Sequence, residues 1–185
     1  MQHSDHELML RCGQGDAAAF DLLVRRWELP VGNVLRRLVR NAADADDLRQ
    51  DTFVRVLLAS RRYRPTGEFS AWLFRIVVNL ARDAARRRKR RHEMIDQELI
   101  VEGNASPATE SARRETAALV EDALGALPNR LREVLVLRHY GDLSFARMSE
   151  VLGEPASTIK SRTKTALQRL HGELRRRGLT NGELE

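Results

Sequence analysis

Cationic side chains and an amide recur at helical spacing between residues 69 and 91. The row comprises Arg75, Asn79, Arg82, Arg86 and Lys89. Steps of three and four residues place these side chains on one side of an α-helix. Arginine and lysine bind phosphate, and an asparagine amide can pair with a base edge. The row therefore has the chemistry to lie along a nucleic acid and contact its bases. An ordinary solvated basic face is the alternative, but Asp and Glu are nearly absent from the row.

The opposite side of the same helix is apolar and predicts burial in a core. It carries Trp72, Leu73, Ile76, Val77, Leu80 and Ala84. The preceding segment, 61–70, contains Pro65 and Gly67, which predict a loop. This loop leads directly into the helix, so its polar side chains should lie beside the basic row.

Composition and charge favour an anionic partner. The chain has 185 residues, of which 42% are hydrophobic and 31% are charged, and its net charge is +6. The excess of Arg and Lys is concentrated at 82–91 and near the end of the chain, which indicates nucleic acid or an anionic membrane. Cys12 is the single cysteine, so an intrachain disulfide and a thiolate metal site are excluded, and we interpret Cys12 as a small buried side chain. The sequence has neither a membrane-length apolar run nor a signal-peptide core, and we expect a cytoplasmic protein.

Strand signals are almost missing, and the residue pattern predicts an all-α protein. Asp16 should cap a first amphipathic helix, which Pro30 should end before another apolar stripe begins. We expect two small helical domains joined by a flexible linker. Their ranges are 1–91, 92–112 for the acidic linker rich in polar residues, Gly and Pro, and 113–185.

A further expected helix, at 44–60, has an acidic row on one side. Asp44, Asp47 and Asp51 form the row, with Val54 and Leu58 set into it. A metal site is disfavoured because no histidine lies nearby and an arginine shares the face. A solvated acidic face remains an alternative. Apolar residues inside a charged rim favour a docking surface for a basic protein partner.

The C-terminal half predicts a four-helix domain that ends in a helix-turn-helix. Ser144 should cap a short helix, Gly153 and Pro155 mark a tight turn, and a basic helix follows at 156–175. We expect its core side to hold Ile159, Thr163, Ala166, Leu167 and Leu170. In such motifs the exposed start of the second helix reads the major groove.

Together the two halves resemble a bacterial extracytoplasmic-function (ECF) sigma factor, a member of the sigma-70 family in which region 2 and region 4 are joined by a linker. Segments 45–53 and 69–87 are similar to regions 2.2 to 2.4, and segments 127–135 and 152–170 are similar to region 4. The resemblance implies a transcription initiation factor that binds core RNA polymerase, selects promoters through −10 and −35 elements and helps to melt the −10 DNA. It implies neither an enzyme nor a cofactor or metal.

The resemblance also assigns residues to three surfaces. Those for the β′ clamp helices of core polymerase are Asp44, Asp47, Leu48, Gln50, Asp51, Phe53 and Val54. Those for the single-stranded −10 element are Thr66, Gly67, Glu68, Phe69, Ser70, Trp72, Arg75, Asn79, Arg82, Arg86 and Arg87. Those for the double-stranded −35 element are Ser157, Thr158, Lys160, Ser161, Arg162, Lys164 and Arg169. Region 4 would also touch the β flap, and the free chain would be a monomer.

Some residues depart from the family pattern. Segment 144–149 lacks the paired acidic residues that are common there, and Ser157 replaces a frequent glycine. An anti-sigma factor is a further candidate partner, although no residue of the chain points to one. A helix-turn-helix regulator that binds an operator without polymerase explains only 144–175. A nuclease is disfavoured because the histidines are scattered and none shares a face with a carboxylate pair.

Overall fold

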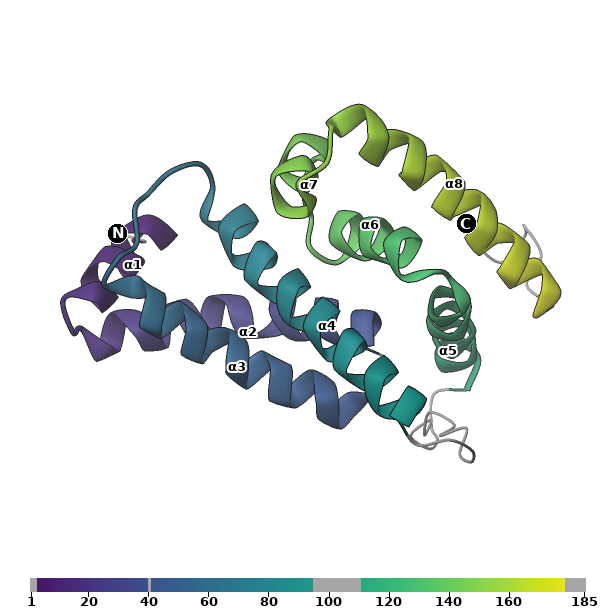
Figure 1. The fold of residues 1–185 in the computed structure, drawn as a ribbon, viewed down its shortest axis with the longest axis horizontal. Helices are drawn as coiled ribbons and strands as arrows, with labels where there is room; N and C mark the ends of the chain where they lie inside the picture. Colours follow the sequence, from purple (N-terminus) through teal and green to yellow (C-terminus); the bar gives the residue numbers. More distant parts are fainter. Residues whose placement is uncertain (1–2, 40, 95–110, 179–185) are drawn as a thin grey trace.

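The computed structural model describes residues 3–39, 41–94 and 111–178, and every regular element in these ranges is an α-helix. The all-helical prediction is confirmed. The helices are α1 (Asp5–Gly13), α2 (Ala17–Val39), α3 (Ala42–Ser60), α4 (Phe69–Met94), α5 (Ser111–Ala126), α6 (Asn129–His139), α7 (Phe145–Leu152) and α8 (Ala156–Arg176). Figure 1 shows α1–α4 as one group and α5–α8 as another.

The first group is a bundle in which α2, α3 and α4 pack against one another and α1 packs on α2 and α3. Ser4 and Glu7 start α1 with a reciprocal capping box. Asn41 caps α3 by accepting a hydrogen bond from the Asp44 amide. Fully buried side chains from all four helices, including Leu8, fill the space between them.

Pro30 does not end a helix, contrary to the sequence-based expectation. It lies inside α2, which continues to Val39. Proline has no N–H to donate to the preceding turn, so an isolated helix would break here. The next turn carries Val31, Val34 and Leu35, which are fully buried. Their burial offsets the lost hydrogen bond and keeps the helix continuous.

The second group begins after the expected linker. α4 runs to Met94 and α5 starts at Ser111, so most of the expected linker, 95–110, lies outside the described residues. Pro128 separates α5 from α6 as predicted, and Ser144 caps α7 by accepting from the Arg147 amide. Gly153 ends α7 with a left-handed φ of 70°, and α8 follows. The predicted helix-turn-helix is therefore present.

Burial in the second group differs from the pattern expected from the sequence. The side chains from 132 to 137 in α6 are all buried, because this helix lies between α8 and α2. Leu167, expected in the core, is 49% exposed because it lies on the outer side of α8. Ile159, Thr163 and Ala166 are buried as predicted.

The two groups share one interior. α7 packs against α4, while α5 and α6 pack against α2 (Figure 1). Buried apolar residues of both groups form a continuous cluster that runs from Leu8 to Ala166. The sequence predicted two units but contained no sign of this packing.

Candidate functional site

The outer face of α3 combines carboxylates with exposed apolar side chains. Asp44, Asp47 and Asp51 are exposed, as is Gln50. In line with them, Val54 is 55% and Leu58 is 73% exposed. Large apolar side chains this open to solvent in the middle of a charged row are typical of an interface core with a polar rim.

Two residues assigned to this face lie elsewhere. Leu48 and Phe53 are buried on the core side of α3, because they fall on the same side as Thr52 and Val56. Their side chains cannot contact a partner and instead fix the position of the helix. Leu57, which the sequence analysis did not select, is 44% exposed and extends the apolar part of the face. Its position in the sequence, directly before Leu58, was the signal that could have assigned Leu57 to this face.

Among the described residues, the carboxylates of α3 do not gather into a metal-binding group. In the described parts of the chain no group of His, Cys, Asp or Glu side chains is arranged to hold a metal ion. In the same residues no helix is long and apolar enough to cross a membrane.

The loop before α4 is held from below by aromatic rings. The ring centroids of Tyr63 and Trp72 are 5.1 Å apart, and those of Phe69 and Trp72 are 5.5 Å apart. The Tyr63 hydroxyl is also 2.7 Å from Nδ1 of His6, and burial raises the pKa of this tyrosine. The tip of the loop, at Thr66, Gly67 and Glu68, is exposed above this cluster.

Three of the predicted −10 residues, at the start of α4, are less exposed than the tip of the loop. Phe69 is buried in the first turn of α4, so its ring supports the loop and cannot stack on a base. Ser70 and Trp72 also lie at the start of α4 and are partly buried. Gly67 has a φ of 71°, a backbone conformation that favours glycine, which explains why the loop reverses there.

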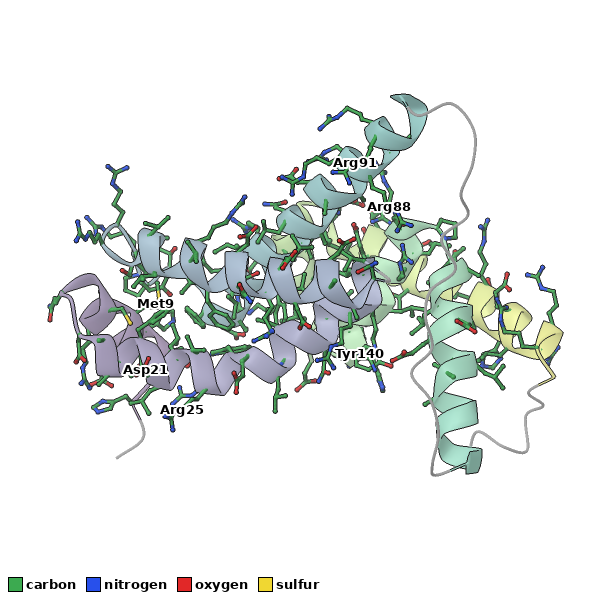
Figure 2. The ribbon with its side chains drawn as sticks, turned by 90° about the horizontal axis from the view of Figure 1, so that it is seen from below. Met9, Asp21, Arg25, Arg88, Arg91 and Tyr140 are labelled. Carbon is green, nitrogen blue, oxygen red and sulfur yellow. The ribbon has the colours of Figure 1, made fainter. Side chains whose placement is uncertain are left out.

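The basic row of α4 follows this loop along the helix. Arg75, Asn79, Arg86 and Arg87 are exposed, whereas Arg82 is partly buried. Arg86 forms an ion pair with Asp83. Figure 2 shows Arg88 and Arg91 on the last turns of α4, where the helix extends beyond the rest of its group. The exposed members of the row therefore lie along α4 on both sides of the partly buried Arg82.

Two arginines of this row contact the second group. Nη2 of Arg75 donates to the backbone oxygen of Glu150 at 2.7 Å. Arg82 donates through Nε and Nη2 to the two carboxylate oxygens of Glu133, at 2.9 and 2.7 Å. The hydrogen bonds from Arg82 to Glu133 raise the pKa of Arg82 above its usual value. Glu133 was not predicted from the sequence, because it lies 51 residues away from Arg82 in the chain and its position in α6 carries no distinctive pattern.

The outer face of α8 carries the predicted −35 residues. All are exposed except Arg162, which is partly buried: Ser157, Thr158, Lys160, Ser161, Arg162, Lys164 and Arg169. Nη1 of Arg162 donates to Oε1 of Glu154 at 3.0 Å, and a second contact joins the same side chains. The hydrogen bond from Arg162 lowers the pKa of Glu154. Glu154, in the turn before α8, thus positions an arginine on the second turn of this helix.

Two family models match the chain. The one described as Sigma-70 region 2 matches residues 23–91, which span most of α2 and reach through the basic row of α4. The one described as Sigma-70, region 4 matches residues 123–171, which include the helix-turn-helix. The chain belongs to the sigma-70 family. The resemblance found in the sequence is confirmed.

Relatives place the chain among the ECF sigma factors of that family. The RNA polymerase sigma-H factor of Pseudomonas aeruginosa is 30% identical over 171 residues, which are 87% of this chain and 89% of that protein. The ECF RNA polymerase sigma factor SigM of Mycobacterium tuberculosis is 34% identical over 91% of this chain and 84% of its own length. The protein is therefore an RNA polymerase sigma factor that functions in transcription initiation.

Solved structures agree with this assignment. The structure of CnrH in complex with the cytosolic domain of CnrY aligns with a TM-score of 0.72 and 29% identity, and it covers 93% of this chain and 97% of the solved chain. The sigma factor RpoE of Bartonella quintana, solved with the anti-sigma factor NepR, aligns with a TM-score of 0.73 at 24% identity over 84% of this chain and 96% of that one. The second likeness concerns the fold alone.

Proposed function

We propose that this sigma factor divides its work between three surfaces. Residues 1–91 dock on core RNA polymerase and read the −10 element, 92–112 form the linker, and 113–185 read the −35 element. The observation that carries this proposal is a single chain with an acidic and apolar face on α3 and basic faces on α4 and α8. A regulator that binds an operator without polymerase would need neither the α3 face nor the α4 face.

The α3 face suits a partner with basic and apolar side chains. Val54, Leu57 and Leu58 would form the buried centre of the interface, and Asp47 and Asp51 would lie at its rim. Burying exposed apolar surface contributes about 25 cal/mol per Å² before the costs of association. Rim carboxylates add partner selectivity and faster association. By resemblance the partner is the pair of clamp helices of the polymerase β′ subunit.

The loop tip and the basic row suit a melted strand. Flipping a base out of the duplex costs on the order of a few kcal/mol. Thr66, Gly67 and Glu68 offer backbone and side-chain hydrogen bonds to such a base, and the aromatic cluster below them keeps the loop in place. Asn79 supplies a further base contact, while Arg86 and Arg87 hold the phosphates of the displaced strand.

The start of α8 suits the major groove of duplex DNA. Ser157, Thr158 and Lys160 are exposed on its first turns, and Glu154 holds Arg162 in a fixed direction. Each mismatched base pair in a site costs about 1–3 kcal/mol, so neither element alone selects a promoter strongly. Binding both surfaces to one polymerase makes the second DNA contact intramolecular and the pair selective.

The remaining assignments follow from this role. We infer that the protein has no catalytic activity of its own, that it acts in the cytoplasm with RNA polymerase, and that it is a monomer when free. The CnrH and RpoE structures contain partner proteins, and on this basis we propose an anti-sigma factor as a further partner.

Run-off transcription with purified core polymerase on genomic fragments tests the proposed function. We expect discrete transcripts that require both the chain and core polymerase. A gel shift of the same fragments, with and without core, separates this function from operator binding. A tight, specific shift by the chain alone, with no transcript in the presence of core, would establish the regulator instead.

A further inference from the structure

The first helix, α1, lies outside the part of the chain that the region 2 model matches, which begins at residue 23. It is nevertheless fixed to the rest of its group. Oδ1 of Asp5 accepts a hydrogen bond from Nη1 of Arg26, on α2, at 2.5 Å. A Cβ atom on Gly13 would lie 2.7 Å from the backbone oxygen of Ser60, the last residue of α3. α1 is thus held at the point where the chain leaves α3 for the loop before α4 (Figure 1).

One side chain of α1 reaches this loop. Nδ1 of His6 lies 2.7 Å from the Tyr63 hydroxyl, and the two rings are stacked with their centroids 5.9 Å apart. Tyr63 is only 5% exposed, and among the described residues His6 is the hydrogen-bond partner of its hydroxyl. Burial, and to a smaller extent the charge of Asp5, raises the pKa of Tyr63, so the hydroxyl keeps its proton and can donate to Nδ1 of a neutral His6.

Tyr63 in turn connects the two ends of the loop. Its ring centroid lies 6.3 Å from that of Phe69 and 5.1 Å from that of Trp72, and both of these residues are at the start of α4. Phe69 also packs on Trp27 of α2, with 5.7 Å between the ring centroids. The exposed residues 64–68 therefore leave and rejoin the core through side chains that contact each other. A fixed Tyr63 sets the distance that these residues must span.

We propose that His6 is a positioning residue for −10 recognition, because its hydrogen bond to Tyr63 fixes the loop whose tip would receive the flipped base. This inference rests on the proposed role of the loop tip in base binding. A binding loop that is already ordered loses less conformational entropy when its ligand binds, and small displacements of a recognition site weaken its selectivity. α1 would therefore act on base selection without contacting DNA.

Hydrogen exchange measured by NMR tests whether His6 fixes the loop in the free chain. The amides of Tyr63 and Thr66 donate to the backbone oxygens of Ser60 and Arg64, so their exchange reports opening of the loop. We expect His6→Ala to accelerate exchange at both amides by at least about fivefold, because it leaves the Tyr63 hydroxyl buried without this partner. His6→Asn should restore slow exchange, since Oδ1 of an asparagine can take the position of Nδ1 as the acceptor.

His3→Ala is the matched control for this measurement. His3 lies in the same segment, but the contacts of its side chain are with Glu7 and Arg11, which do not belong to the loop. Exchange at Tyr63 and Thr66 should be unchanged in this variant. Equal acceleration in His3→Ala and His6→Ala would show a general loosening of α1 and would overturn the proposal, as would unchanged exchange in His6→Ala.

The second test measures base discrimination by holoenzyme formed from the full chain and core polymerase. The templates are a promoter from the run-off assay and its variants with each of the four bases at each −10 position. We expect His6→Ala to reduce the transcription ratio between the best and the worst base by at least about fivefold at the flipped position, and His6→Asn to retain the ratio. A variant that is merely less stable loses activity on every template in the same proportion, so an unchanged ratio would overturn the proposal.

The two tests separate this inference from the proposed function. Transcripts from the unaltered chain, together with an unchanged ratio in His6→Ala, would reject the inference alone. No transcript from the unaltered chain would reject the proposed function and the role in base selection together. The exchange measurement contains neither polymerase nor DNA, and it decides in either case whether His6 fixes the loop.

Discussion

A substitution at Asn79 can distinguish contact with DNA bases from contact with DNA phosphates. It is exposed on α4 between Arg75 and Arg82, and it is the uncharged member of a cationic row. An amide adds little to long-range attraction for a polyanion, but it can donate to and accept from a base edge. Asn79 should therefore contribute to the binding free energy once the bases are unpaired, and not when the duplex first binds.

Asn79→Ala should lower promoter opening much more than duplex binding. Loss of a base contact costs about 1–3 kcal/mol, which corresponds to roughly a 5- to 150-fold loss of open complex. Permanganate reactivity of −10 thymines measures opening, and a gel shift of the closed complex measures binding. Asn33→Ala, an exposed amide on α2, is the control. An unchanged permanganate pattern in Asn79→Ala would remove the residue from the −10 surface.

The ion pair of Glu154 predicts how the free energy of unfolding changes with pH. Its pKa is lowered, chiefly by the hydrogen bond from Arg162. A carboxylate with a depressed pKa in the folded state stabilises the fold above its unfolded pKa, about 4.3, and loses that contribution as the pH falls through the lower folded value. Urea unfolding between about pH 6 and pH 3 should show a smaller acid-induced loss of stability in Glu154→Gln than in the unaltered chain. Equal losses would mean that the ion pair does not stabilise the fold.

Single-residue exposure was predictable where a helix has one buried side. Asp47, Val54 and Lys160 are exposed as their spacing predicts. The partners Glu133, Arg147 and Glu150 were not predictable, because their contacts join residues more than fifty positions apart in the chain. Helical spacing carries information about the near neighbours of a residue and none about the element that will pack on it.

At the level of elements, the helix-turn-helix depends on the backbone at its turn. Gly153 ends α7 in the left-handed conformation, and a Cβ added there would meet nothing within 4 Å, so the strain of a substitution comes from the backbone alone. Gly172 lies inside α8 with similar open space and no positive φ. Substitution by alanine therefore tests backbone strain at Gly153 and helix propensity at Gly172, two effects of opposite sign.

Gly153→Ala should lower the free energy of unfolding by about 1 kcal/mol, because a Cβ is disfavoured at positive φ. Gly172→Ala should raise it by about 0.5–1 kcal/mol, because alanine has the higher helix propensity. Urea denaturation of the two variants measures both changes. Changes of the same sign would show that the backbone at Gly153 is not constrained as described.

The positions of the helices followed closely from the sequence, but the burial of their side chains did not. Pro128, Ser144 and Gly153 mark helix boundaries because each acts on its own turn. Pro30 failed as a boundary, since the burial of Val31 and Val34 outweighs a local signal. α6 is buried over most of its surface because helices pack on opposite sides of it, which no periodicity could reveal.

At the scale of the whole molecule, the α3 face points away from the contact between the two groups. The contacts that close the molecule come from α2, the loop before α4, α4 itself and the helices of the second group. Asp51 and Leu58 therefore stay accessible to a partner while the two groups are in contact.

Docking of α3 on core polymerase is tested most directly by the equilibrium affinity of a charge-reversal variant. Asp51→Lys changes the middle of the acidic and apolar face, and Asp122→Lys makes the same change at an exposed position on α5. We predict that Asp51→Lys weakens binding to core polymerase by at least about tenfold, since like charges at an interface are strongly unfavourable, and that Asp122→Lys binds as the unaltered chain does. Unchanged binding by Asp51→Lys would contradict the assignment of this face to the polymerase.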